Sequence, residues 1–163
     1  MNNHDGTFRE VSGQLGAEFS KASVGRGLCV ADFDNDGDLD FALSNNGGAA
    51  ELWRNDGGNK NNWIGFDLLG TKSNRDGVGA KIWVMAGADT QYQQRLGGGS
   101  YLSASDPRIF VGLGKSKKAD LVRILWPSGL KQEFRDLTAN HYFTLTEGAA
   151  PLPRAAAKTQ RLP

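Results

Sequence analysis

Apolar and polar residues alternate with a period of two over many short segments of the chain. Residues 63–69 place Ile64, Phe66 and Leu68 on one face, and residues 79–85 repeat the pattern. Successive side chains of a strand point to opposite faces of a sheet, so each segment predicts a strand with one buried face. Similar short apolar runs follow at residues 91–96, 109–113, 121–126, 132–135 and 142–146. Gly, Pro, Asp and Asn separate these runs, and that spacing predicts a β-sandwich.

The first sixty residues predict a second, smaller sheet. Short apolar or alternating runs occupy residues 7–11, 28–31, 41–44 and 51–54, with Gly-rich and Asn-rich turns after them. These turn residues favour tight connections between strands. We therefore expect one sheet of three or four strands before residue 59.

An acidic loop, DFDNDGDLD, lies between the runs at residues 28–31 and 41–44. Its carboxylates occupy every second position, at Asp32, Asp34, Asp36, Asp38 and Asp40. Charges at this spacing repel one another in a compact turn, and a hard cation with oxygen ligands relieves the repulsion. The first three suit side-chain ligation, Asp38 can offer its backbone carbonyl, and Asp40 can close the shell. The loop is therefore predicted to bind Ca²⁺.

The flanks of the acidic loop distinguish it from an EF-hand. An EF-hand needs a Glu at position twelve and a helix on each side, whereas this chain has Leu43 there and short apolar flanks. The loop is therefore predicted to join two strands. Magnesium is less suited, because it requires tight octahedral geometry and keeps its waters. The alternative interpretation is a solvated acidic turn, since Asp-Gly pairs occur in turns of many kinds.

Composition and charge agree with a mostly β, globular protein. The chain has 163 residues, 39% of them hydrophobic, with 22 Gly, 5 Pro and a formal net charge of +1. Abundant Gly favours short strands and tight turns over helices. The balanced charge gives no reason to expect a nucleic-acid partner, and no apolar run is long enough to predict membrane insertion or a signal peptide.

Several polar residues in predicted turns are candidates for a ligand-binding face. They are Arg75, Asp76, Tyr101, Asp106 and Arg108. The alternative is structural, with each arginine paired with its neighbouring aspartate to hold a loop. Trp53, Trp63 or Tyr101, where exposed, could instead stack on a sugar.

No catalytic motif is complete. The sequence GLGKS at residues 112–116 ends like a phosphate loop, but Ile109 stands where the first glycine is required. The two histidines, His4 and His141, are accompanied by no Gly-x-Ser-x-Gly nucleophile elbow. We therefore predict a protein without enzymatic activity.

Two sets of segments resemble known families. NNHDGTF, GRGLCVADFDNDGDLDFALSNNGG and ELWRNDGG resemble one FG-GAP/VCBS repeat, the unit that forms a four-stranded, calcium-binding blade in integrin-like β-propellers. SNRDGVGAKI, GGGSYLSASDPRIFVGLG, DLVRILWPSGLKQEF and ANHYFTLTEG resemble the ASPIC/UnbV domain, which typically follows such repeats. The resemblance implies a partial propeller blade over residues 1–58 and an ASPIC/UnbV-like β-sandwich over residues 59–147. Residues 148–163, rich in Ala and Pro, are expected to be a disordered tail.

These resemblances also imply a function. One blade cannot close a propeller, so we expect a C-terminal piece of a longer protein whose remaining blades are absent. The families imply an extracellular or cell-surface, calcium-binding, non-enzymatic module for adhesion or for binding a protein or glycan. A carbohydrate-binding module, and an accessory protein or enzyme of a biosynthetic pathway, remain the alternatives.

Overall fold

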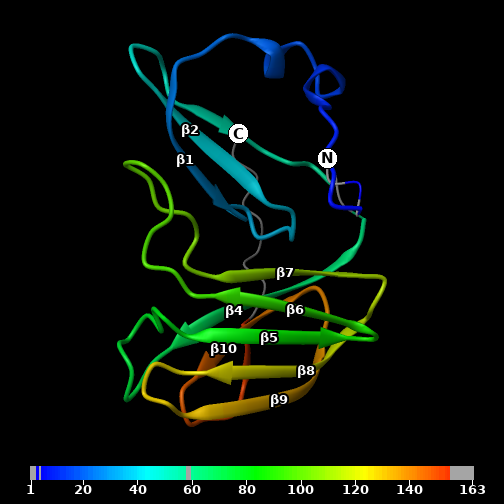
Figure 1. The fold of residues 1–163 in the computed structure, drawn as a ribbon, viewed down its shortest axis with the longest axis vertical. Helices are drawn as coiled ribbons and strands as arrows, with labels where there is room; N and C mark the ends of the chain where they lie inside the picture. Colours follow the sequence, from blue (N-terminus) through cyan, green and yellow to red (C-terminus); the bar gives the residue numbers. More distant parts are fainter. Residues whose placement is uncertain (1–2, 4, 58–59, 155–163) are drawn as a thin grey trace.

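The computed structural model describes residues 3, 5–57 and 60–154. Within these ranges the chain forms three β-sheets, two single-turn 3₁₀ helices and no α-helix. The smallest sheet lies at one end of the molecule and the two larger sheets lie at the other (Figure 1). The all-β prediction is confirmed, and the sheets do not close into a barrel.

The small sheet is an antiparallel meander. Its strands are β1 (Gly25–Ala31), β2 (Asp40–Asn45) and β3 (Glu51–Trp53), in that order. The last pair of the β1–β2 ladder joins Ala31 to Asp40, so the acidic loop closes this hairpin. The prediction that the loop joins two strands is confirmed.

The expected strand over residues 7–11 does not form. Phe8 makes a single bridge, and the chain then turns through η1 (Ser12–Gln14) and η2 (Glu18–Ser20). The Phe8 side chain is 77% exposed, so the segment buries no apolar face against the small sheet. Without that burial, the alternation of a few residues does not hold a strand in place.

The two larger sheets contain the remaining strands. One has the order β11-β10-β4-β7, with β10 parallel to β4 and the other pairs antiparallel; the other is fully antiparallel, with the order β6-β5-β8-β9. The strands are β4 (Asn62–Leu69), β5 (Lys81–Ala86), β6 (Asp89–Gln94), β7 (Ile109–Gly114), β8 (Lys118–Leu125), β9 (Lys131–Thr138), β10 (His141–Thr146) and β11 (Leu152–Arg154).

One hydrophobic core lies between the two larger sheets. Ile64, Phe66 and Leu68 of β4 contribute to it from one sheet, and Ile82 and Val84 of β5 contribute from the other. These are the faces that the alternating pattern predicts to be buried. By contrast, among the described residues every buried hydrophobic side chain lies at residue 63 or later. The small sheet therefore has little hydrophobic core of its own.

The C-terminal segment is ordered further than expected. Leu152–Arg154 forms β11, which pairs antiparallel with Tyr142, Phe143 and Thr144 of β10. The disordered tail predicted from residue 148 is therefore wrong for residues 152–154, because the open edge of β10 offers backbone hydrogen bonds to a passing strand. The rest of that prediction, residues 155–163, lies outside the described residues.

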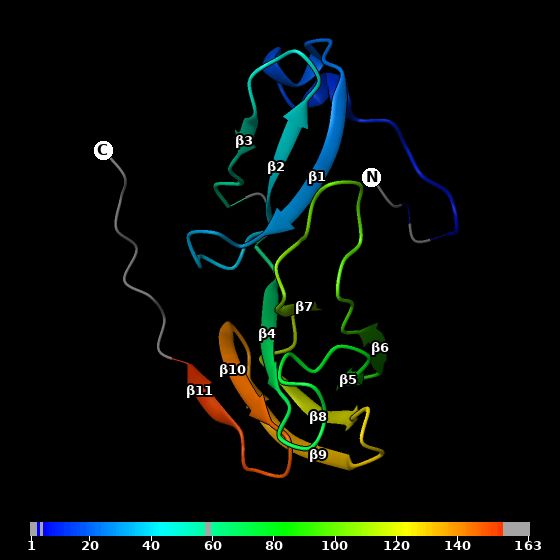
Figure 2. The same ribbon diagram turned by 90° about the vertical axis from the view of Figure 1, so that its left-hand side faces the viewer.

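The acidic loop meets the larger sheets at one end of β4. In Figure 2 the end of the β1–β2 hairpin lies above β4, and the connection between β6 and β7 rises beside β1. Trp63 and Tyr142 are buried but do not belong to the hydrophobic core, since their neighbours Ile64 and Phe143 are the ones that point into it. The loop covers these two rings from the opposite face of the sheet.

Candidate metal centre

The acidic loop is wound so that its backbone N–H groups point at its first carboxylate. Asp36 N donates to Asp32 Oδ1 over 3.1 Å, and Gly37 N donates to Asp32 Oδ2 over 3.0 Å. Asn35 and Gly37 have left-handed φ angles of 60° and 97°, and these reverse the chain within a few residues. Asparagine and glycine adopt that conformation more readily than other residues, so the local sequence suits the winding.

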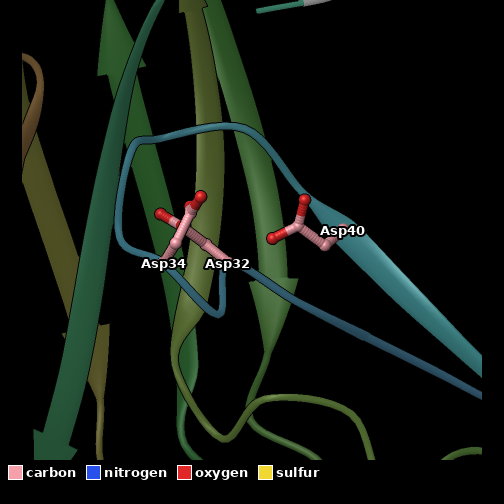
Figure 3. A group of neighbouring side chains, drawn as sticks. All are labelled: Asp32, Asp34 and Asp40. Atoms are coloured by element: carbon pink, nitrogen blue, oxygen red, sulfur yellow. The ribbon is translucent and has the colours of Figure 1, made fainter. Parts of the chain in front are cut away.

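Three of the five aspartates converge at the mouth of the loop. Asp32, Asp34 and Asp40 each offer one carboxylate oxygen, and these oxygens all lie within 4.8 Å of one another. Asp32 and Asp40 are 1% and 2% exposed. In Figure 3 the carboxylates of Asp32 and Asp34 lie close together, and that of Asp40 is directed toward them from the start of β2.

The other two aspartates have different positions. Asp36 is exposed, and its Oδ1 accepts a hydrogen bond from Asp38 N over 2.9 Å. Asp38 is buried, but its carboxylate is not part of the group of three. The structure thus brings together three of the predicted ligands and uses Asp36 to shape the turn.

The donor set suits a hard divalent cation. Carboxylate oxygens are the ligands that calcium prefers, and within the described part of the chain none of the three aspartates forms a salt bridge. Burial raises the pKa of Asp40; hydrogen bonds from Asn55 N and Phe33 N oppose this, and the charges of Asp34 and Asp36 raise it further. Buried carboxylates this close together repel one another, and a bound cation would remove that repulsion.

The acidic loop packs on two aromatic rings of the β11-β10-β4-β7 sheet, those of Trp63 and Tyr142. Trp63 of β4 stacks on Phe110 of β7, with ring centroids 5.3 Å apart, and lies 4.8 Å from the Tyr142 ring of β10. Gly37 packs directly on the indole, because a Cβ at this position would lie 1.9 Å from Trp63 Nε1. The Tyr142 hydroxyl donates to Asp32 Oδ2 over 2.6 Å.

Arg108 holds the loop from a second side. Its Nη2 donates to the backbone carbonyl of Asp32 over 2.7 Å, and its Nη1 donates to the Asn35 side chain over 2.5 Å. The guanidinium also lies 4.2 Å from the centre of the Tyr142 ring and pairs with Asp106 through Nε at 2.8 Å. Burial lowers the pKa of Arg108, and the hydrogen bond and charge of Asp106 more than offset this.

The segment before β7 also binds the edge of the small sheet. Ser103 Oγ donates to Leu28 O over 2.8 Å, Val30 N donates to Ser105 Oγ over 3.2 Å, and Asp106 N donates to Val30 O over 2.8 Å. Residues 103–106 thus take the place of a further strand beside β1. This pairing satisfies backbone groups that an open sheet edge would leave to water.

The five predicted ligand-binding residues do not form one cluster of contacts. Asp106 and Arg108 pair with each other, whereas Arg75 and Asp76 are exposed in the connection between β4 and β5 and form no salt bridge within the described residues. Tyr101 is 67% exposed. A hollow of about 400 Å³ lies beside Asp106 and Arg108. Trp63 is buried, so it does not meet the condition of exposure on which stacking with a sugar was suggested.

Glu147 is a buried carboxylate outside the acidic loop, and the sequence analysis did not identify it. It is 3% exposed and lies just after β10. Its carboxylate accepts hydrogen bonds from the backbone N–H groups of Thr71, Lys72 and Ser73 at 2.7–2.8 Å, from Ser73 Oγ at 3.0 Å and from Ser128 Oγ. Burial acts to raise the pKa of Glu147, but these hydrogen bonds outweigh it and lower the pKa to about 2.

Comparison with known proteins identifies relatives of the chain. The family described as ASPIC and UnbV matches residues 70–152. Cartilage acidic protein 1 from Xenopus tropicalis is 34% identical over 109 residues, which cover 64% of this chain and 16% of the relative. The protein of the same name from Homo sapiens has the same identity and coverage. The chain thus spans about a sixth of the length of these curated relatives.

Proposed function

Since the chain belongs to the ASPIC and UnbV family, we propose that it is a calcium-binding, non-enzymatic module that binds a protein or a glycan. The observation that carries the proposal is the convergence of Asp32, Asp34 and Asp40, with their oxygens within 4.8 Å of one another. We further propose that residues 1–58 are one FG-GAP/VCBS-type blade. The β1–β2 hairpin with the acidic loop at its tip supports this assignment.

Calcium in this proposal acts on structure. It would draw together Asp32 and Asp34, which follow β1, and Asp40, which begins β2. The small sheet has most to gain, because no buried hydrophobic side chain among the described residues belongs to it. At free calcium ten times the dissociation constant, binding adds about 1.4 kcal/mol to the free energy of unfolding. For an extracellular module the dissociation constant is expected at about 0.1–1 mM.

A binding role is favoured over catalysis by the surroundings of the buried acids. Asp32 is held by Asp36 N, Gly37 N and Tyr142, and Glu147 is held by five donors from neighbouring loops. Carboxylates engaged in this way serve to hold the backbone and are poorly placed to exchange protons with a substrate.

We propose an extracellular or cell-surface location. The support for this location is that the relatives are named for cartilage. No helix among the described residues is long and apolar enough to cross a membrane. A glycan array, screened with and without calcium, would distinguish a glycan ligand from a protein ligand.

Calorimetric titration of the chelator-treated protein with Ca²⁺, paired with thermal melts, tests the proposed site. We expect about one equivalent of calcium to bind and the melting temperature to rise with calcium. Asp40→Asn should abolish both effects, because it removes one of three converging charges. The matched control is Asp89→Asn, an exposed position on β6, which should bind calcium like the parent.

Two results would contradict the proposal. The parent chain could show no saturable binding up to about ten times the expected dissociation constant. Alternatively, Asp40→Asn could retain the calcium-dependent rise in melting temperature. Either result would favour the solvated acidic turn.

A further inference from the structure

The acidic loop and the residues that hold it in place belong to different parts of the chain. The loop belongs to the small sheet, whereas Tyr142 and Arg108 belong to the part that contains the two larger sheets. We propose that Tyr142 and Arg108 are positioning residues that set the calcium affinity of the loop, so that the cation site is a composite of both halves. This inference rests on the proposed calcium binding.

Tyr142 fixes the orientation of the Asp32 carboxylate. Among the described residues its hydroxyl is the only hydrogen-bond donor to the Asp32 carboxylate from outside the loop. A carboxylate oxygen has about two acceptor sites. Asp32 Oδ2 already accepts from Gly37 N and Tyr142, whereas Oδ1 accepts only from Asp36 N. The hydroxyl thus leaves Oδ1 as the oxygen available to a cation.

The Tyr142 ring itself has a fixed position. Gly65 lies opposite it on β4, and a Cβ there would fall 2.1 Å from two atoms of the ring. The Trp63 indole packs on one side of the ring, and the Arg108 guanidinium lies over it.

Arg108 fixes the backbone of the loop. It binds the carbonyl of Asp32 and the side chain of Asn35, which span the first turn of the loop. Asn35 has a left-handed φ of 60°, so the contact holds a residue in a sparsely populated conformation. With that turn held, Asp32 and Asp34 are presented to a cation without a further loss of backbone freedom.

Two consequences follow from such a composite. Hydrogen bonds that orient metal ligands commonly change metal affinity by about tenfold or more when removed. Linkage is reciprocal. If packing of the loop on Tyr142 and Arg108 raises the calcium affinity by some factor, bound calcium must favour that packing by the same factor. If the contacts served packing alone, their loss would lower the melting temperature equally with and without calcium.

Calcium titration of Tyr142→Phe tests the inference. The variant keeps the ring and loses only the hydroxyl, so we expect about tenfold weaker calcium binding. Tyr92→Phe is the matched control: it removes a hydroxyl from a half-exposed ring on β6 and should bind like the parent. Circular dichroism of the calcium-free variants establishes that both are folded.

Arg108→Lys provides an independent variant. Lysine keeps the positive charge near the cation site but cannot bind Asp32, Asn35 and Asp106 with one planar group. Weaker calcium binding would therefore report lost positioning and not a change of charge. Arg123→Lys, at an exposed position on β8, is its control.

The outcomes separate the two proposals. If the parent binds calcium and both folded variants bind it with parental affinity or more tightly, the composite site is wrong and the calcium-binding function stands. If the parent binds no calcium, both proposals fail. If Tyr142→Phe does not fold, the calcium affinity of Arg108→Lys decides. Amide hydrogen exchange of the parent, measured with and without calcium, is a further test. If calcium protects only residues 32–40, and not residues 63 and 142, the inference is wrong.

Discussion

Asp40 and Glu147 show two ways in which this chain buries an acid. Glu147 is surrounded by hydrogen-bond donors, and its pKa falls to about 2 from an ordinary 4.5. Asp40 has fewer donors and lies among other aspartates, and its pKa is raised. The hydrogen-bonding capacity of the Glu147 carboxylate is satisfied by the protein itself. Asp40 is the carboxylate whose surroundings favour a cation.

Glu147→Gln should remove an acid-sensitive part of the stability. The folded-state pKa of about 2 lies below the ordinary value of 4.5, so the parent binds fewer protons folded than unfolded between these values. The contribution is complete above about pH 4.5 and is lost as the pH falls toward about 2. Denaturant melts between pH 2 and pH 7 should show a smaller loss of stability in the variant than in the parent.

The same variant should also melt at a lower temperature at pH 7. A glutamine offers one acceptor oxygen, and its NH₂ group would face backbone N–H donors. Glu18→Gln, at an exposed position, is the control and should follow the parent. An unchanged pH profile for Glu147→Gln would show that the hydrogen bonds around Glu147 do not shift its titration in solution.

At the scale of elements, local sequence predicted most strands but not how they pair. Alternation identified β4 and β5, because one face of each is buried in the core. It could not indicate that β10 runs parallel to β4, since that pairing joins residues as far apart in the sequence as Ile64 and His141. Nor could it reveal β11, whose position depends on the open edge of β10.

The candidate site shows the same division. The acidic loop was predicted as a metal site from the spacing of its aspartates, because all the candidate ligands are local in the sequence. The packing of the loop on Trp63, Arg108 and Tyr142 could not be predicted, because these residues meet only through the order of β10, β4 and β7. One signal was present: Trp63 and Tyr142 are large aromatic residues on the strand faces opposite the core, where a covering segment is needed to bury them.

Gly37→Ala should disrupt the packing of the acidic loop on the Trp63 indole. The new Cβ would lie 1.9 Å from Trp63 Nε1, and φ is 97°. Left-handed backbone alone costs about 1–3 kcal/mol for such a residue, and the clash adds to it. Gly47→Ala is the matched control, with φ at 74° and no atom within 4 Å of the added Cβ.

Comparison of the two alanine variants isolates the contact with Trp63. Gly37→Ala should lower the free energy of unfolding well beyond Gly47→Ala, as measured by denaturant melts in calcium. Equal losses for the two variants would mean that the loop does not rest on the indole in solution.

At the scale of the whole molecule, the halves differ in what stabilises them. The larger sheets share a hydrophobic core, whereas the small sheet relies on the Phe19, Phe41 and Trp53 rings and on its contacts with the other half. A chain beginning at residue 60 would leave Trp63 and Tyr142 uncovered. We expect it to fold, to melt at a lower temperature than the full chain, and to bind more of an apolar fluorescent dye.

That shortened chain has a defined contrary outcome. Equal melting temperatures and equal dye binding would show that the acidic loop contributes nothing to the burial of these rings. The full chain measured with chelator is the reference, so that loss of calcium and loss of the small sheet are not confused.

The hydrogen bond between Tyr142 and Asp32 spans 110 residues, and this separation has a consequence for biosynthesis. A ribosome adds about 5–20 residues per second, so the loop emerges roughly 5–20 seconds before the tyrosine that receives it. During that interval the nascent hairpin carries its negative charges without the hydrogen bond from Tyr142. Maturation of the loop therefore waits for the synthesis of residue 142, and a ribosome stalled before this residue would display a hairpin whose contacts are incomplete.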